Sequence, residues 1–293
     1  MGGGGGWDYD YSEAALKKSS KEYTEQAAAQ GIVREYRGDE SKGLPPPVGK
    51  DVTTDSPTPL VVCVDISGSM SHWPGVIFTK LPVLYNEARL HLPDLEISFA
   101  AIGDPSCHMI QICDFMKGKD LEEGINAIHP CGGDEYFELT MYYYARHCTM
   151  RKAQRGLMVI CGNEPYRDTI EAGHVKSYVG DDVQGNLKTA DIIKELQQRF
   201  DPYMLYVPET SGIDTWQKGF GRQMVLELKD PSRIVDCIIG LCAIFADDYA
   251  AFQKRIAIRQ TPEQVNQVMA TLHPLLAARQ KPAPQKARGK RRK

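Results

Sequence analysis

The sequence predicts a doubly wound α/β fold with a mostly parallel central sheet, one antiparallel hairpin at its edge, and helices on both faces. Two short segments, 60–66 and 157–161, are almost entirely apolar, which is typical of strands buried on both faces. Segments with the helical spacing of apolar residues alternate with such strands. This alternation indicates a parallel sheet covered on two sides. In folds of this class, ligands bind beyond the carboxyl ends of the strands.

The elements are predicted in chain order from apolar spacing and from the turn residues that flank each segment. A helix-forming segment extends from Tyr11 to about Gln30, with Ser12 as its N-cap. Strands are expected at 60–66, 95–102, 109–115, 157–161, 204–207 and 224–228, and the second and third of these form the edge hairpin. Helices are expected at 76–92, 121–128, 136–150, 186–200, 232–250 and 262–278.

Composition divides the chain into five parts. They are a Gly-rich leader with an N-terminal helix (1–37), a Pro/Gly linker (38–57), the α/β domain (58–250), a C-terminal helical extension (251–280) and a basic disordered tail (281–293). The tail has seven Lys or Arg residues, and removing them from the net charge of −3 leaves −10 for the rest. An acidic body argues against binding DNA along the whole domain. We expect a solvated tail, with nucleic-acid contact by the tail as the alternative.

The composition also bounds the class of protein. With 42% hydrophobic residues, the chain has enough apolar content to exclude disorder throughout. No apolar run approaches the roughly 18 residues of a membrane span, and no secretory signal is visible. The eight cysteines are scattered and mostly lie in apolar runs, where they are expected to be small buried side chains. These features favour a reducing, cytoplasmic location.

The loop after the first buried strand has the pattern of a cation site. Asp65, Ser67 and Ser69 alternate on one turn, and Gly68 allows the backbone to curl so that both hydroxyls converge. Three oxygen ligands with a single charge suit Mg²⁺, which prefers oxygen and keeps several waters; Mn²⁺ and Ca²⁺ are alternatives. The competing interpretation is a polar turn in which a serine caps the next helix.

With its D-x-S-x-S loop after a buried strand, the chain resembles the von Willebrand factor A (VWA) family, whose metal-ion-dependent adhesion site (MIDAS) has this motif. The resemblance covers about residues 58–245. It includes the Gly132-Gly133 loop, the helix opening at 135–139, and the strand 157–161 with the loop 162–166 that follows. These last segments are most similar to bacterial intracellular VWA proteins. The resemblance implies a Rossmann-like fold and a role in protein–protein interaction.

Two positions depart from the family's pattern. Asp134 stands where the family commonly has Thr, and Asn163 stands where it commonly has Asp. The number of carboxylates is unchanged, since Asp65 and Asp134 provide two. Asn163 keeps a neutral oxygen that can hold a metal-bound water. Alternatively, Asp134 only caps the following helix and Asn163 only shapes its loop.

The resemblance implies that the cation captures a carboxylate of a protein partner. The predicted metal ligands are Asp65, Ser67, Ser69, Asp134 and Asn163, and the predicted partner contacts are His72, Trp73, Glu135 and Glu164. Trp73 could equally cover the core. By analogy with bacterial VWA proteins, the partner is an AAA+ ATPase or another assembly component.

A non-enzymatic role is favoured, because the sequence has no phosphate-binding P-loop and no G-x-S-x-G elbow. One alternative is a metal-dependent phosphoryl hydrolase that uses the same loop. The other is a metal-free scaffold with a degenerate site, which makes its contacts through the N-terminal helix and the basic tail.

Overall fold

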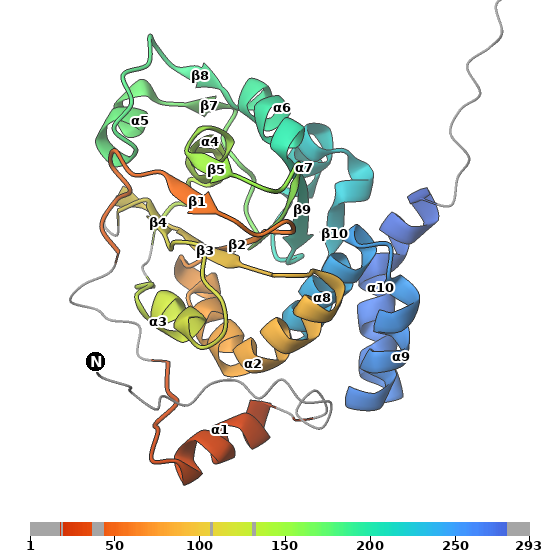
Figure 1. The fold of residues 1–293 in the computed structure, drawn as a ribbon. Helices are drawn as coiled ribbons and strands as arrows, with labels where there is room; N and C mark the ends of the chain where they lie inside the picture. Colours follow the sequence, from red (N-terminus) through yellow and green to blue (C-terminus); the bar gives the residue numbers. More distant parts are fainter. Residues whose placement is uncertain (1–17, 19, 37–43, 106–107, 131–132, 280–293) are drawn as a thin grey trace, which may run out of the picture.

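A six-stranded sheet forms the centre of the molecule. The computed structural model describes residues 18, 20–36, 44–105, 108–130 and 133–279 (Figure 1). The strand order is β10-β9-β6-β2-β3-β4, and all neighbours are parallel except β3 and β4. The strands are β2 (Leu60–Asp65), β3 (Ile97–Ile102), β4 (Ile110–Ile112), β6 (Gly156–Gly162), β9 (Phe200–Tyr206) and β10 (Val225–Glu227). The predicted fold class, including the edge hairpin, is confirmed.

Helices cover both faces of the sheet, as expected for a doubly wound fold (Figure 1). Those that share a core with one face are α1 (Ser20–Ala29), α2 (Trp73–His91), α3 (Asp120–Asn126), α8 (Ile234–Phe245), α9 (Tyr249–Arg259) and α10 (Pro262–Arg279). Those on the other face are α4 (Phe137–Arg146), α5 (Ala172–Tyr178), α6 (Thr189–Arg199) and α7 (Ile213–Phe220). Within the described residues, no helix combines the length and the apolarity needed to cross a membrane.

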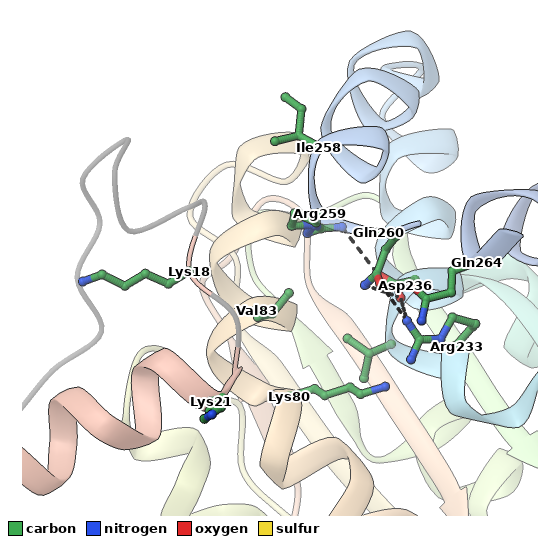
Figure 2. Close-up of a pocket in the computed structure, with 11 residues that line it drawn as sticks. Lys18, Lys21, Lys80, Val83, Arg233, Asp236, Ile258, Arg259, Gln260 and Gln264 are labelled. Atoms are coloured by element: carbon green, nitrogen blue, oxygen red, sulfur yellow. Dashed lines mark hydrogen bonds and ion pairs between the residues drawn. The ribbon is translucent and has the colours of Figure 1, made fainter. Parts of the chain in front are cut away.

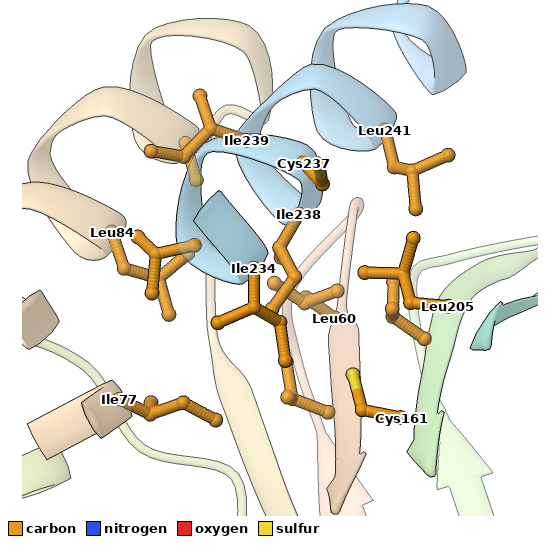
Figure 3. Packing of buried hydrophobic residues seen from close by; sticks show 14 of the residues in the cluster. Leu60, Ile77, Leu84, Cys161, Leu205, Ile234, Cys237, Ile238, Ile239 and Leu241 are labelled. Atoms are coloured by element: carbon orange, nitrogen blue, oxygen red, sulfur yellow. The ribbon is translucent and has the colours of Figure 1, made fainter. Parts of the chain in front are cut away.

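Alternation along β2 divides the buried side chains between two cores. Leu60, Val62 and Val64 belong to the core beneath α2 and α8, whereas Val61 and Cys63 belong to the core beneath α4 and α6. Figure 3 shows the first core, in which side chains of α2 and α8 meet those of β2, β6 and β9. Because both faces are buried, β2 has to be apolar throughout until it reaches Asp65 at the rim.

Two short strands replace parts of elements that we predicted differently. The helix expected at 136–150 ends at Arg146, and Cys148–Met150 form β5. The strand β5 pairs in parallel with β1 (Val52–Thr54), which lies inside the predicted linker 38–57. Local helical spacing could not reveal this pairing, because the two strands are far apart in sequence. A second small ribbon pairs β7 (Thr169–Ile170) with β8 (Leu187–Lys188), and β8 occupies the start of the helix predicted at 186–200.

The C-terminal helices extend the first core. The helix predicted at 232–250 is two helices, since α8 ends at Phe245 and α9 begins at Tyr249, with Asp247 between them at a positive φ of 54°. The predicted boundary at residue 250 therefore falls inside α9. Side chains of α9 and α10, including Phe252 and Leu272, are fully buried in the core of the sheet domain. The expected N-terminal helix start at Tyr11 with its cap Ser12, residues 38–43 of the linker, and the tail 281–293 lie outside the described residues.

Candidate metal-binding site

Three loops meet at the carboxyl edge of the sheet because their strands are neighbours. The order β9-β6-β2 places the ends of these parallel strands side by side. Asn163 follows β6, and its amide Nδ2 donates hydrogen bonds to Ser69 Oγ (3.4 Å) and to Glu209 Oε2 (3.1 Å). Ser69 Oγ also donates to Glu209 Oε2 at 3.3 Å. The structure therefore brings together Ser69 and Asn163, which the sequence predicted, and adds Glu209 from the loop after β9.

Asp65 is the buried centre of this edge. Its Oδ1 accepts hydrogen bonds from Ser67 N (2.9 Å) and Ser67 Oγ (2.8 Å). Gly68, with a positive φ of 39°, supplies the turn that brings Ser67 back over the end of the strand. Asp65 Oδ2 is buried and has no hydrogen-bond partner among the described residues. An unpaired buried carboxylate oxygen is costly, so a proton or a cation is required at this position.

Glu135 adds a second carboxylate to the same hydroxyl. Its Oε1 lies within hydrogen-bond distance of Ser67 Oγ, which also faces Asp65 Oδ1. A hydroxyl has one proton, so it can donate to only one of these two oxygens at a time. Burial raises the pKa of Asp65 from 3.8 to about 7, and the charges of Glu135 and Glu164 add to this rise, although the hydrogen bonds from Ser67 oppose it. The pKa of Glu164 is also raised, by burial and by Glu135.

Asp134 does not join this cluster, which corrects the prediction that it binds the cation directly. Its carboxylate lies 3.1 Å from the guanidinium of Arg167, and its side chain is 78% exposed. Arg167 also donates to the backbone carbonyl of Glu135 and lies 3.8 Å from the centre of the Tyr136 ring. Arg167 thus fixes the loop so that Asp134 faces outward while Glu135 faces Ser67. Glu135, and not Asp134, is therefore the acid of this loop that lies beside Ser67.

The predicted partner-contact residues differ in their exposure to solvent. Trp73 is 1% exposed and its indole Nε1 donates to Met70 Sδ, so it is a core residue and cannot be a partner contact. His72 is exposed beside it, and His72 Nδ1 lies 2.9 Å from Ser69 O. Glu164 is partly exposed on the loop after β6. His72 and Glu164 therefore lie on or near the rim of the site.

Gly133 precedes Asp134 and Glu135 in their loop and permits close approach of the segment that follows β3. Gly133 has a φ of 124°, and a Cβ at this position would overlap the carboxylate of Asp104, which follows β3. Only glycine fits both the backbone conformation and the space. Gly132, which the resemblance paired with Gly133, lies outside the described residues.

Sequence reasoning missed two functional candidates, Arg167 and Glu209. Glu209 follows a predicted strand by two residues, and a survey of polar residues at every strand end would have included it. No three His, Cys, Asp or Glu side chains form a metal-binding group in the part of the chain that the structure describes. A cation here would therefore depend on hydroxyl oxygens as well as carboxylates. The orphaned Oδ2 of Asp65 and the doubly engaged Ser67 fit such an ion.

Comparison with known proteins finds similarity in structure. No family model and no curated protein matches the chain. The pilus adhesin SpaC from Lactobacillus rhamnosus GG, in its open conformation, is 12% identical with a TM-score of 0.46, over 71% of this chain and 31% of that one. The SpRpn10 VWA domain is 10% identical with a TM-score of 0.38, over 57% of this chain and 85% of that one.

A von Willebrand factor type A structure from Catenulispora acidiphila is 14% identical with a TM-score of 0.40, over 64% of this chain and 42% of that one. The present chain spans about a third of the length of the pilus adhesin and less than half of the Catenulispora chain.

Proposed function

We propose that this chain is a protein-interaction domain that binds an acidic side chain of a partner through Mg²⁺ at the cluster around Asp65. The proposal rests above all on Asp65 Oδ2, a buried carboxylate oxygen with no partner among the described residues. The residues that would hold the ion are Asp65, Ser67, Ser69 and Glu135, with Asn163 in support. When bound, the ion supplies an exchangeable coordination position for an incoming oxygen.

The electrostatics of the cluster support a cation. Within the described residues, no Lys or Arg lies within ion-pair distance of Asp65, Glu135, Glu164 or Glu209. The mutual repulsion of these carboxylates contributes to the raised pKa values of Asp65 and Glu164. A divalent cation would relieve this repulsion and would also satisfy Asp65 Oδ2.

The same charges make partner binding strictly dependent on metal. Glu209 lies beside the exposed hydroxyl of Ser69, and Glu135 and Glu164 add negative charge near Asp65, so an approaching carboxylate is repelled when the cluster is empty. The charges of Asp65 and Glu135 together equal that of one divalent ion. The ion and its two carboxylates therefore carry no net positive charge that would attract the partner. A partner carboxylate binds by replacing a ligand of the ion, and contacts between the partner and the rim of the site have to supply the rest of the affinity.

The finer parts of the proposal follow from the family resemblance. We propose an AAA+ ATPase or another assembly component as the partner, and a cytoplasmic setting. The six described cysteines are free and buried, which supports a reducing compartment. We also propose a binding role and not a catalytic one.

Calorimetric titration of the full chain with MgCl₂ tests the metal site. We expect one ion per chain, no binding in Asp65→Asn, and unchanged affinity in Asp134→Asn. The last variant is the matched control, because Asp134 is an acid on the same loop that Arg167 holds away from the cluster. Absence of Mg²⁺ binding by the wild-type chain would contradict the site.

Two further measurements test the role. Partner capture from host lysate should be lost on adding EDTA and in Asp65→Asn, and retained in Asp134→Asn. Capture that persists with EDTA would favour the metal-free scaffold. Turnover of p-nitrophenyl phosphate that requires Mg²⁺ and Asp65 would favour the hydrolase.

A further inference from the structure

A second polar cavity lies away from the Asp65 cluster, where α1, α2, α8, α9 and α10 come together. Its volume is about 370 Å³, and Figure 2 shows the side chains that line it. Five of its lining residues are cationic and one is acidic: Lys18, Lys21, Lys80, Arg233, Arg259 and Asp236. We call this cavity the basic pocket. Its charge is opposite to that of the Asp65 cluster, so the two sites select different ligands.

Two guanidinium groups of the basic pocket are fixed by Asp236. Arg233 and Arg259 lie 3.4 Å from opposite oxygens of this carboxylate, and Gln260 Nε2 donates to its Oδ2 at 3.1 Å. Arg259 also pairs with Glu87 at 3.1 Å, and Arg233 lies 4.0 Å from Asp230. These side chains are mostly buried, with exposures of 12% for Arg233, 7% for Arg259 and 4% for Asp236. The donors are therefore held in place before any ligand binds.

Some donors in the basic pocket remain without an acidic partner. The ammonium group of Lys80 donates to the backbone carbonyl of Ser232, and no carboxylate among the described residues lies within ion-pair distance of it. Burial, together with the nearby charge of Arg233, lowers the pKa of Lys80, although the charges of Asp236 and Asp230 oppose this shift. Arg259 Nε is buried and makes no hydrogen bond to any described residue. A buried ammonium group without an ion-pair partner, close to an arginine, and an unsatisfied guanidinium N–H both favour a bound anion.

The rest of the lining indicates an organic body attached to the anion. Val83, Val235 and Ile258 contribute apolar surface, and Ile258 is 71% exposed, which is unusual for a large aliphatic side chain. The volume lies in the range of small-molecule pockets, roughly 300–1,000 Å³. Paired guanidinium forks beside an ammonium group match the several acceptor oxygens of a phosphate.

We propose that the basic pocket binds an organic phosphate, with the phosphate group at Lys80, Arg233 and Arg259 and the organic body over Ile258. This site is separate from the proposed metal site and does not depend on it. A bound phosphate would connect α2, which follows the Asp65 loop, to the start of α8 and the end of α9.

Phenyl phosphate is the probe for this proposal, because it joins a phosphate group to a small apolar body. The full chain in EDTA is titrated calorimetrically with phenyl phosphate, inorganic phosphate and benzoate. We expect one phenyl phosphate per chain, bound at least tenfold more tightly than either of the others, and weakened by added NaCl. Undetectable binding at millimolar phenyl phosphate, or equal affinity for benzoate, would overturn the proposal.

Matched variants locate the binding. Lys80→Gln and Arg233→Gln should each weaken phenyl phosphate binding about tenfold or more, since charge-assisted hydrogen bonds of this kind are lost. Lys218→Gln, an exposed lysine on α7, should leave the affinity unchanged. Ile258→Ser should weaken phenyl phosphate but not inorganic phosphate.

Melting curves identify any variant that loses its fold, and the remaining variants then decide the question. Retained affinity in a folded Lys80→Gln or Arg233→Gln chain would refute the site. Asp65→Asn should bind phenyl phosphate normally, so failure of the metal site and failure of the basic pocket are distinguishable.

Discussion

Replacing Asp65 by Asn should stabilise the chain in the absence of metal. The side chain is fully buried, and its pKa is raised from 3.8 to about 7, first by burial and then by Glu135 and Glu164. The folded state therefore binds a proton more tightly than the unfolded state, so stability is lost as pH rises from about 4 to about 7. Above pH 7 the ionised carboxylate costs up to about 4 kcal/mol by this difference in pKa.

The expected gain in Asp65→Asn is smaller than that upper limit. Asn keeps an oxygen that can accept the two hydrogen bonds from Ser67, but its amide Nδ2 replaces an oxygen that has no partner among the described residues. An unpaired amide costs roughly 1–3 kcal/mol. We therefore expect a net gain of about 2 kcal/mol at pH 8 in EDTA, which corresponds to a rise of roughly 5 °C in melting temperature.

Thermal melts with and without MgCl₂ provide the assay. Magnesium at about 100 times its Kd should stabilise the wild-type chain by about 2.7 kcal/mol and leave Asp65→Asn unchanged. The stability advantage of the variant over the wild type should therefore shrink or reverse when metal is added. In EDTA, the wild-type melting temperature should fall between pH 5 and pH 8, whereas that of the variant should change less. A variant that is less stable than the wild type in EDTA at pH 8, together with no effect of Mg²⁺ on either chain, would refute the reasoning.

Three further predictions concern other parts of the molecule. Glu135→Gln should weaken Mg²⁺ binding at least tenfold in calorimetry, because it removes the carboxylate that contacts Ser67; an unchanged affinity would remove Glu135 from the site. Burial lowers the pKa of His147, but its contacts with Asp181 (2.8 Å) and Asp51 (2.7 Å) outweigh burial and raise the pKa. The stability that protonated His147 contributes should therefore be lost as pH rises above about 6.5. In urea melts at pH 5 to 8, His147→Gln should lack this pH-dependent part of the unfolding free energy. Gly240→Ala should cost about 1–3 kcal/mol, because its Cβ would lie 2.4 Å from Leu272 on α10; an unchanged urea midpoint would show that the C-terminal helices do not pack against α8.

The sheet could be predicted because its central strands are buried on both faces. Their apolar runs are short, contain β-branched residues and end at turn residues, so β2 and β6 were located nearly to the residue. The pairing of β1 with β5 could not be predicted in this way. Its two strands have three residues each and lie about a hundred residues apart in sequence, so the local sequence of neither strand indicates which strand it pairs with.

The candidate site likewise combines contacts that depend on local sequence with contacts that depend on residues distant in sequence. Asp65 and Ser67 are two residues apart, so the contact between them depends on one turn and could be predicted from the sequence. The choice between Asp134 and Glu135 depends on Arg167, which is more than thirty residues away and holds the loop from outside. Glu209 reaches the site only because β9 lies beside β6. Which side chain faces the site thus depends on tertiary neighbours and cannot be predicted from a local sequence pattern.

The basic pocket was not predicted for the same reason. Its five cations lie in or just before α1, in α2, in the turn before α8 and in α9, and they are separated in sequence by up to about 240 residues. Taken alone, each of these residues is an ordinary charged side chain on a helix or at its end. The packing of α8 and α9 against α2 brings them to one cavity, where Arg233 and Arg259 pair with Asp236.

The central claim is that a divalent cation binds at Asp65 and keeps a position open for an acidic ligand. Water-proton relaxation with Mn²⁺ as the probe tests both halves at once, because a bound ion enhances relaxation only while exchangeable water remains on it. We predict an enhancement that disappears with EDTA and in Asp65→Asn, and that decreases when a glutamate-containing peptide is added. An enhancement that is identical in wild type and Asp65→Asn, or its absence from the wild type, would contradict the claim.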